Sequence, residues 1–127
     1  MTQELGTFIR TDSVMFEYDV HDMKRAVTWY KEILGLKVVF QGGECHTEFT
    51  LPVKGVRLAL SLADKDKKIL KGDRLFIPVT DINAIETYLT TKGVKTHREK
   101  VNDIVLILWV EDSEGNLFAF KQWVNRT

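Results

Sequence analysis

Two segments of the chain repeat the same pattern, and this repeat constrains the fold more than any other feature of the sequence. Each segment begins with an apolar, strand-like run that ends in Val-x-Asp, with Val20 and Asp22 in the first copy and Val79 and Asp81 in the second. A repeat of this kind indicates one supersecondary unit that occurs twice. The chain is therefore expected to fold as two similar modules.

A helical pattern follows each of the two aspartates. An aspartate at a helix N-cap accepts a hydrogen bond from a backbone N–H of the first turn. Both patterns end at a glycine, Gly35 or Gly93, where a left-handed backbone causes no steric strain. Apolar residues lie at helical spacing on one face; they are Met23, Ala26, Val27, Tyr30, Ile33 and Leu34 in the first copy and Ile82, Ile85, Tyr88 and Leu89 in the second.

Strand-like stretches separated by turns follow each helix. The first copy continues with KVVFQ, CHTEFTL and VRLALSL, and the second with VKTHREK, DIVLILWV and NLFAFKQWV. The last two stretches are joined by a turn in which Gly115 and Asn116 accept positive φ angles. Each half thus reads βαβββ, with module 1 at about residues 13–63, a polar linker at about 64–72 and module 2 at about 73–123. The predicted fold class is α+β within a single domain.

Composition narrows the range of partners and locations. The 127-residue chain has 18 basic and 18 acidic residues, so its formal net charge is zero. This balance gives no reason to expect nucleic acid or a membrane as a partner. The single cysteine, Cys45, cannot form an internal disulfide, and the N-terminal residues lack a signal-peptide pattern. We therefore expect a cytoplasmic protein.

Several of these motifs resemble one known superfamily. The tandem βαβββ pattern, Val-x-Asp before each helix, WYKEILGLKV in the first copy and EDSEGN before the last strand resemble the vicinal oxygen chelate superfamily. It includes glyoxalase I, bleomycin-resistance proteins, extradiol dioxygenases and methylmalonyl-CoA epimerase. The resemblance spans roughly Val14 to Trp123. It implies cup-shaped, mostly antiparallel sheets with helices on the outside, and a site enclosed within one chain or across a homodimer.

The resemblance also implies where a divalent metal would be bound. In the metalloenzymes of the superfamily, His, Gln or Glu side chains from the first and last strands of the modules hold the metal. The matching positions here are Met15, Ala59, Arg74 and Ala119. Alanine has no donor atom, the methionine thioether is a soft ligand and arginine repels a cation. We therefore expect no cofactor, and a divalent metal is the alternative.

The strongest alternative metal ligands are in the stretch ECHTE. Glu44, His46 and Glu48 alternate along this stretch and so share one face of a strand. A usable metal site needs ligands that converge from several strands and further residues that hold them in place. A solvent-facing hairpin tip explains the same three residues without a metal, and we favour that interpretation.

Alternation along the strands predicts which side chains face the helices and which face the site. Phe16, Tyr18 and Val20 form an apolar face for the helix, which leaves Met15, Glu17 and Asp19 for the site. The other side chains predicted to face the site are His46, Glu48, Thr50, Arg57, Ala59 and Ser61 in module 1 and Arg74, Phe76, Pro78, Leu117, Ala119 and Lys121 in module 2. The face on which Trp109 lies stays open.

The candidate ligand-binding residues combine a polar set in module 1 with an aromatic and cationic set in module 2. They are Met15, Glu17, His46, Glu48, Arg57, Ser61, Arg74, Phe76 and Trp109. Aromatic walls bury the body of an organic ligand, and an arginine orients its carboxylate or carbonyl group. Alternatively, the arginines pair with acidic side chains on neighbouring strands.

Three functions are compatible with this pattern. The first is metal-free binding of a small organic molecule, anionic or amphiphilic, by a homodimer related in kind to the drug-sequestering resistance proteins. The second is a glyoxalase-type lyase, isomerase or dioxygenase that depends on a metal or uses Glu17 as a general base, with a simple ion pair at Glu17 as the competing interpretation. The third is a non-catalytic dimerisation or regulatory domain. Whether the protein is an enzyme stays open.

Overall fold

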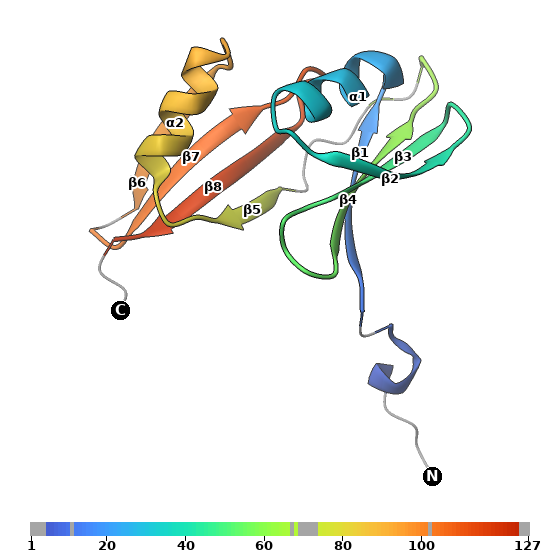
Figure 1. Cartoon of the computed structure of the whole chain (residues 1–127), viewed down its shortest axis with the longest axis horizontal. Helices are drawn as coiled ribbons and strands as arrows, with labels where there is room; N and C mark the ends of the chain where they lie inside the picture. Colours follow the sequence, from blue (N-terminus) through green and yellow to red (C-terminus); the bar gives the residue numbers. More distant parts are fainter. Residues whose placement is uncertain (1–4, 11, 67, 69–73, 102, 125–127) are drawn as a thin grey trace.

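The computed structural model describes residues 5–10, 12–66, 68, 74–101 and 103–124. They form a short 3₁₀ helix (Leu5–Phe8), two α-helices and eight strands in two four-stranded sheets (Figure 1). The predicted α+β class is confirmed. The predicted linker lies partly outside the described residues, at positions 67 and 69–72. In the part of the chain that the structure describes, no helix has the length and apolar character needed to cross a membrane.

The first module contains one helix and four strands. Its elements are β1 (Val14–Val20), α1 (Met23–Glu32), β2 (Lys37–Gly42), β3 (His46–Thr50) and β4 (Val56–Leu62). The strand order in the sheet is β1-β4-β3-β2. Strands β1 and β4 are parallel, and the other two pairs are antiparallel.

The second module repeats this arrangement strand for strand. Its elements are β5 (Leu75–Pro78), α2 (Ile82–Thr91), β6 (Thr96–Val101), β7 (Val105–Glu111) and β8 (Leu117–Trp123). The strand order is β5-β8-β7-β6, again with one parallel pair, β5 and β8, beside two antiparallel pairs. The identical topology confirms the internal repeat that the sequence predicts.

Both helices begin where the sequence predicts, but α1 ends at Glu32, so the predicted helical residues Ile33 and Leu34 lie beyond it, and α2 ends at Thr91, two residues before Gly93. The Asp22 side chain accepts a hydrogen bond from the backbone N–H of Arg25 at 3.0 Å, and Asp81 accepts one from Ala84 at 3.1 Å. These bonds satisfy donors that have no partner within the helix. Gly35 and Gly93 follow the helices with φ angles of 67° and 76°, which residues with a Cβ atom rarely adopt.

A hydrophobic core with side chains from both modules joins them, and a smaller cluster of Val105, Ile107 and Ala119 lies apart from it. The largest fully buried side chains are Tyr30, Phe49, Phe118, Leu58, Leu60, Ile82, Leu89 and Leu108, and they come from both modules. Tyr18 and Val20 are buried as predicted, whereas Phe16 remains 37% exposed. Phe16 lies on the predicted face, but it borders a groove between the modules instead of packing under α1.

Each helix packs on one face of its own sheet. Helix α1 contacts β4, and α2 contacts β6, β7 and β8. We call the opposite face of each sheet, which its helix leaves uncovered, the open face. The predicted site residues are those expected to lie on the two open faces.

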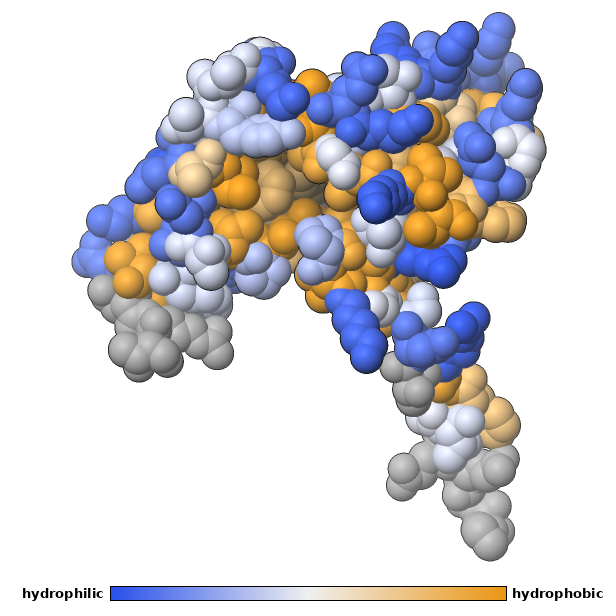
Figure 2. Space-filling model, in the orientation of Figure 1, coloured by the Kyte–Doolittle hydropathy of each residue, from blue (hydrophilic) through white to orange (hydrophobic). Residues whose placement is uncertain are grey.

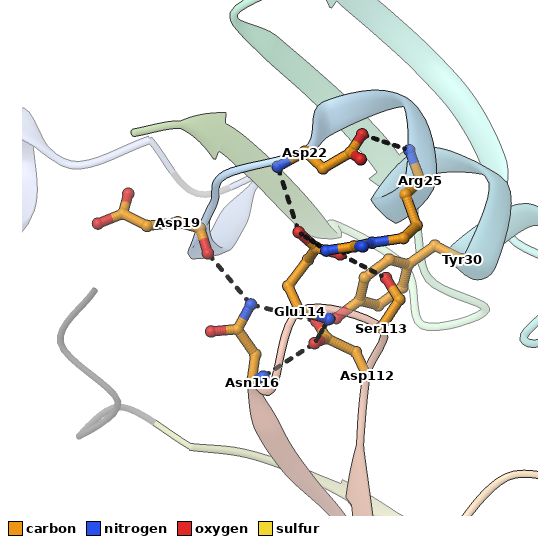
Figure 3. A network of polar contacts seen from close by, with 8 residues as sticks. All are labelled: Asp19, Asp22, Arg25, Tyr30, Asp112, Ser113, Glu114 and Asn116. Carbon is orange, nitrogen blue, oxygen red and sulfur yellow. Dashed lines mark hydrogen bonds and ion pairs between the residues drawn. The ribbon is translucent and has the colours of Figure 1, made fainter. Parts of the chain in front are cut away.

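A polar network connects α1 to the β7–β8 hairpin (Figure 3). The Tyr30 hydroxyl donates to Asp112 Oδ2 at 2.6 Å, and Asp112 Oδ1 accepts from the backbone N–H groups of Glu114 and Asn116, each at 2.8 Å. The Asn116 side chain donates to the backbone carbonyl of Asp19 at 3.1 Å. The turn that the sequence identifies as a hairpin therefore also holds the two modules together.

Glu114 completes this junction at the start of α1. Its carboxylate accepts from Arg25 Nε at 2.7 Å and from the backbone N–H of Asp22 at 3.2 Å. The Glu114 side chain is only 2% exposed. The hydrogen bonds from Arg25 to Glu114, and then the negative charge of Glu114, raise the pKa of Arg25.

Candidate functional site

The open face of module 1 brings together the polar residues that strand alternation selects. The strand register aligns Glu17 of β1 with Ala59 of β4, and Ala59 with Glu48 of β3. One position along, Asp19 aligns with Ser61, and Ser61 with His46. Because side chains two residues apart on a strand share a face, the predicted set lies on one surface.

Four of these side chains form a continuous hydrogen-bonded chain across three strands. Ser61 Oγ donates to Glu17 Oε1 at 2.9 Å and lies 3.1 Å from His46 Nδ1. His46 Nε2 lies 2.9 Å from Glu48 Oε2, and Arg57 donates to Glu48 Oε1 at 2.8 Å. The chain therefore runs from a half-exposed carboxylate, Glu17, to one that is 12% exposed, Glu48.

With His46 Nε2 donating to Glu48, this hydrogen-bonded row of side chains has two possible proton arrangements. When Ser61 donates to Glu17, its oxygen accepts from His46 Nδ1, and His46 Nε2 donates to Glu48, so both ring nitrogens carry protons. When His46 is neutral with its proton on Nε2, Ser61 donates to Nδ1 instead and releases Glu17. A proton on His46 is thus coupled to the hydrogen bonding of Glu17 through one hydroxyl group.

Glu48 lies at one end of this hydrogen-bonded row of side chains and is held by two partners. The hydrogen bond with His46 and the hydrogen bond with Arg57 lower the pKa of Glu48. Arg57 therefore follows the alternative interpretation, in which an arginine pairs with an acid on a neighbouring strand. Met15 shares a polar cleft of about 470 Å³ with Glu48, Arg57 and Asp12.

The stretch ECHTE does not bring together the three residues considered as alternative metal ligands. Glu44 lies in the turn before β3 and lines a different cleft with His21 and Asp22. His46 and Glu48 contact each other within 2.9 Å. Across the described ranges, no group of three or more His, Cys, Asp and Glu side chains is arranged to hold a metal ion.

The open face of module 2 is aromatic and cationic. The Arg74 guanidinium lies 5.3 Å from the centre of the Trp109 ring, and Phe76 packs edge-on against the same ring at 5.4 Å. Lys121 Nζ lies over the rings of Phe76 at 5.7 Å and Trp123 at 4.9 Å. The position of Trp109, which the sequence leaves open, is thus on the open face with Arg74 and Phe76.

Two residues of this face are absent from the predicted ligand-binding set. Lys121 is predicted to face the site, and its contact with Phe76 makes it part of the cationic surface. Glu99 on β6 accepts a hydrogen bond from Trp109 Nε1 at 2.9 Å and so fixes the orientation of the indole ring. The charged stretch THREKV contains no signal that selects Glu99, because only the pairing of β6 with β7 brings it to Trp109.

The modules also enclose an apolar groove on the side of the helices, which we call the intermodule groove. It has a volume of about 350 Å³ and is lined by Phe16, Ile33, Leu34, Leu36, Leu51, Pro52, Val53, Val56, Leu75, Phe76, Ile77, Pro78, Ile85, Tyr88, Leu89 and Phe120. Figure 2 shows apolar surface gathered in a hollow between the two modules. Sequence patterns did not predict this groove, because it arises from the placement of one module against the other.

A match to a protein-family model shows to which superfamily the chain belongs. The family model of the Glyoxalase/Bleomycin resistance protein/Dioxygenase superfamily matches residues 13–120. The chain belongs to this superfamily. The resemblance that the sequence motifs indicate is therefore confirmed. No curated protein sequence matches the chain.

Several solved structures share the fold of this glyoxalase-superfamily chain at low sequence identity. TnmS3, an antibiotic binding protein from Streptomyces sp. CB03234, is 19% identical with a TM-score of 0.74, covering 91% of this chain and 98% of its own. A putative glyoxalase family protein from Bacillus anthracis is 16% identical with a TM-score of 0.73 over 98% of this chain and 100% of its own. Lactoylglutathione lyase from Agrobacterium tumefaciens is 14% identical with a TM-score of 0.73 over 89% of this chain and 94% of its own.

The four positions that the resemblance matches to the metal ligands of the metalloenzymes carry no suitable donor set in this chain. Ala59 lies in register between Glu17 and Glu48, and Ala119 lies in register between Phe76 and Trp109. Both alanines are fully buried beneath their neighbours and offer no donor atom. With the soft Met15 and the cationic Arg74 at the other two positions, the set does not fit a divalent metal.

Proposed function

We propose that this glyoxalase-superfamily protein binds a small organic anion with an aromatic or otherwise apolar body on the open faces of its sheets, without a resident metal. One observation carries the proposal. Arg74 and Lys121 are held over aromatic rings on the open face of module 2, and neither forms an ion pair with another residue of the described part of the chain. Cations without acidic partners beside an apolar surface favour an amphiphilic anion.

The energies of the contacts support an anion as the missing partner. A cation over an aromatic ring at an exposed site gains about 0.5–1 kcal/mol, and the ring does not neutralise the charge. A hydrogen bond to a charged group contributes about 1.5–3 kcal/mol, and a guanidinium offers two such bonds to one carboxylate. A bound carboxylate therefore adds to the existing contacts of Arg74, while the rings of Phe76 and Trp109 bury the apolar body of the ligand.

The open face of module 1 offers hydrogen-bond acceptors instead of free cations. Its arginine, Arg57, is already paired with Glu48. This open face therefore offers the carboxylate of Glu17 and the hydroxyl of Ser61. These groups suit donors on the ligand, such as hydroxyl groups. The occurrence of an antibiotic binding protein among the structural neighbours supports small-molecule binding as the class of function.

A binding screen with matched compounds tests this proposal. Thermal shift and calorimetry compare aromatic carboxylates with their neutral amides and with amines of the same shape. We expect the carboxylates to stabilise the protein, since a ligand at about a hundred times its dissociation constant contributes about 2.7 kcal/mol. Equal binding of carboxylate and amide, or preference for the amine, would contradict the proposed ligand class.

Variants assign the binding to the open face of module 2. Arg74→Met and Lys121→Met each remove a charge but keep the aliphatic part of the side chain, and each should weaken carboxylate binding about tenfold or more, which corresponds to about 1.4 kcal/mol. Lys37→Met is the matched control, because Lys37 lies exposed on β2 of the other module. Elemental analysis of protein purified without chelator tests the metal-free part, and a stoichiometric tightly bound metal would overturn it.

A second candidate function is acid–base catalysis at Glu17, and the hydrogen-bonded chain on the open face of module 1 favours it. Glu17 is half-exposed and so within reach of a substrate, and Ser61 connects it to His46 and Glu48. A general base in this position is able to take a proton from a bound carbonyl compound, while a change of protonation at His46 adjusts its hydrogen bonding.

Proton exchange provides the test of this second candidate. Carbonyl compounds with acidic α-protons are incubated with the protein in D₂O, and the loss of the proton signal is followed by NMR. Catalysed exchange that disappears in Glu17→Gln and persists in Glu44→Gln would support a base at Glu17. Exchange at the same rate in both variants would rule this role out.

A further inference from the structure

The intermodule groove has the size and shape of a small-molecule site. Its volume of about 350 Å³ lies within the roughly 300–1,000 Å³ of ligand pockets, whose walls are mostly apolar. One wall comes from module 1, at the end of α1 and the turn between β3 and β4, and the other comes from β5 and α2 of module 2. Figure 2 shows the hollow between these walls. A molecule in the groove is therefore held from two sides.

Hydrogen bonds between the modules hold the two walls of the groove at a fixed distance. The Tyr88 hydroxyl of α2 donates to the carbonyl of Ile33, the C-cap residue of α1, at 2.7 Å. The Tyr18 hydroxyl of β1 accepts from the backbone N–H of Leu75 at 3.1 Å and donates to the Leu117 carbonyl at 3.2 Å. Leu75 itself lines the groove. The groove is therefore preformed, as small-molecule sites usually are.

The lining of the groove favours a molecule without charge. In the described part of the chain, only uncharged side chains line it. The Lys92 ammonium lies 5.1 Å from the centre of the Tyr88 ring, but it donates to the Glu32 carbonyl at 3.4 Å, in the last turn of α1. There its charge offsets the negative end of the helix dipole. Because burial of a charge without a partner is strongly unfavourable, the groove selects against ions.

We propose that the intermodule groove is a second binding site, for a neutral apolar molecule with a body of about two rings. An apolar cavity of about 150 Å³ in a protein is large enough to bind benzene, and the groove has a volume of about 350 Å³. Its rim includes Phe16, Val53, Phe76 and Tyr88, which are 37%, 50%, 42% and 43% exposed. A bound apolar molecule removes these side chains from water, which drives the binding.

Calorimetry with naphthol, which has two fused rings and is uncharged at neutral pH, tests the groove site. We expect one naphthol to bind per chain and Val53→Asp to raise its dissociation constant at least tenfold, because the new charge lies in the apolar groove. Val53 is chosen over Phe76, which also contacts Trp109 on the open face of module 2. Val39→Asp is the matched control, since Val39 on β2 is 46% exposed and does not line the groove. Absence of naphthol binding, or equal losses in the two variants, would overturn the proposal.

Naphthoate, which has the same rings and a negative charge, separates the groove from the open faces. The proposed function places an aromatic carboxylate at Arg74 and Lys121, so Val53→Asp should leave the affinity for naphthoate unchanged. If naphthoate does not bind while naphthol binds and responds to Val53→Asp, the proposed function fails and the groove site stands. If naphthoate loses as much affinity in Val53→Asp as naphthol does, the groove also takes anions, and its preference for a neutral molecule is refuted.

NMR on the natural chain locates the ligand without any substitution. Nuclear Overhauser effects from the naphthol ring protons to the methyl groups of Val53, Val56 and Ile85, which line the groove, would support the site. Effects to the Trp109 ring alone would overturn it. Sedimentation of the same samples tests whether another chain covers the groove. Self-association that Val53→Asp abolishes, together with no bound naphthol, would show such a cover and would also overturn the proposal.

Discussion

The Tyr30 hydroxyl donates to Asp112 Oδ2 at 2.6 Å, and this hydrogen bond joins α1 of the first module to the β7–β8 hairpin of the second. Tyr30 is 1% exposed and Asp112 6% exposed, so water has little access to either partner. Asp112 Oδ1 accepts from two backbone N–H groups, and among the described residues Oδ2 accepts from Tyr30 and, at 3.2 Å, from the Asn116 amide alone. The buried carboxylate thus depends on Tyr30 for its best hydrogen bond.

Replacement of Tyr30 by phenylalanine should destabilise the protein by about 1–3 kcal/mol, because it leaves a buried carboxylate oxygen short of a donor. Chemical denaturation measures the free energy of unfolding. Tyr88→Phe serves as the control, since the Tyr88 hydroxyl also donates to a carbonyl, that of Ile33 at 2.7 Å, but the side chain is 43% exposed. Water can replace that bond, so a loss below about 1 kcal/mol is expected. Equal losses in the two variants would contradict the importance of burial at Tyr30.

The same tyrosine should make stability fall at alkaline pH. Burial, followed by the charge of Asp112, raises the pKa of Tyr30 well above its ordinary value of 10.0. Above about pH 10 the unfolded chain loses this proton while the folded chain keeps it, so the free energy of unfolding declines by up to about 1.4 kcal/mol for each pH unit. Denaturation between pH 9 and 11 should show a steeper decline for the natural chain than for Tyr30→Phe. Parallel curves would show that Tyr30 titrates normally.

Sequence patterns predict most of the local structure and one of the two open faces in detail. Helix caps at Asp22 and Asp81 and strand alternation depend on short stretches, and the structure agrees with both. Alternation alone places Glu17, Ser61 and His46 on one face, although their role in binding remains a prediction. The interpretation of Arg57 as a cross-strand ion pair with Glu48 also follows from the pattern.

Features that depend on the placement of the modules escape such patterns. Asp112 reads as an ordinary turn residue, because nothing near it in the sequence indicates that Tyr30 lies opposite. Phe16 reads as a core residue because its apolar face is correct, yet the gap between the modules leaves it exposed. The orientation of Trp109 was open because β7 is apolar on both faces, and only Arg74 and Phe76 reveal which face it shares.

Two glycines with positive φ angles should respond differently to substitution by alanine. Gly43 has a φ angle of +61° with open space around it, so Gly43→Ala incurs only the left-handed backbone cost of about 1–2 kcal/mol. At Gly55 the added Cβ atom also meets the Asp12 carbonyl oxygen at 2.9 Å, and backbone atoms cannot easily move aside. Gly55→Ala should therefore destabilise the protein more than Gly43→Ala does in denaturation experiments. Equal effects would mean that the backbone around Asp12 shifts freely to make room for the added Cβ atom.

Ala119 offers a test of why this open face differs from that of a metal-binding relative. It lies in register between Phe76 and Trp109, next to strand positions that carry Arg74 and Lys121. A carboxylate introduced as Ala119→Glu would pair with these two cations and so compete with an organic anion for them. Ala119→Gln is the control, because it adds nearly the same volume, with the same overpacking cost of about 1–3 kcal/mol, but no charge. We expect calorimetry to give an aromatic carboxylate affinity at least tenfold lower for Ala119→Glu than for Ala119→Gln. Equal affinities in the two variants would mean that Arg74 and Lys121 do not hold the ligand, because an internal carboxylate would then fail to displace it.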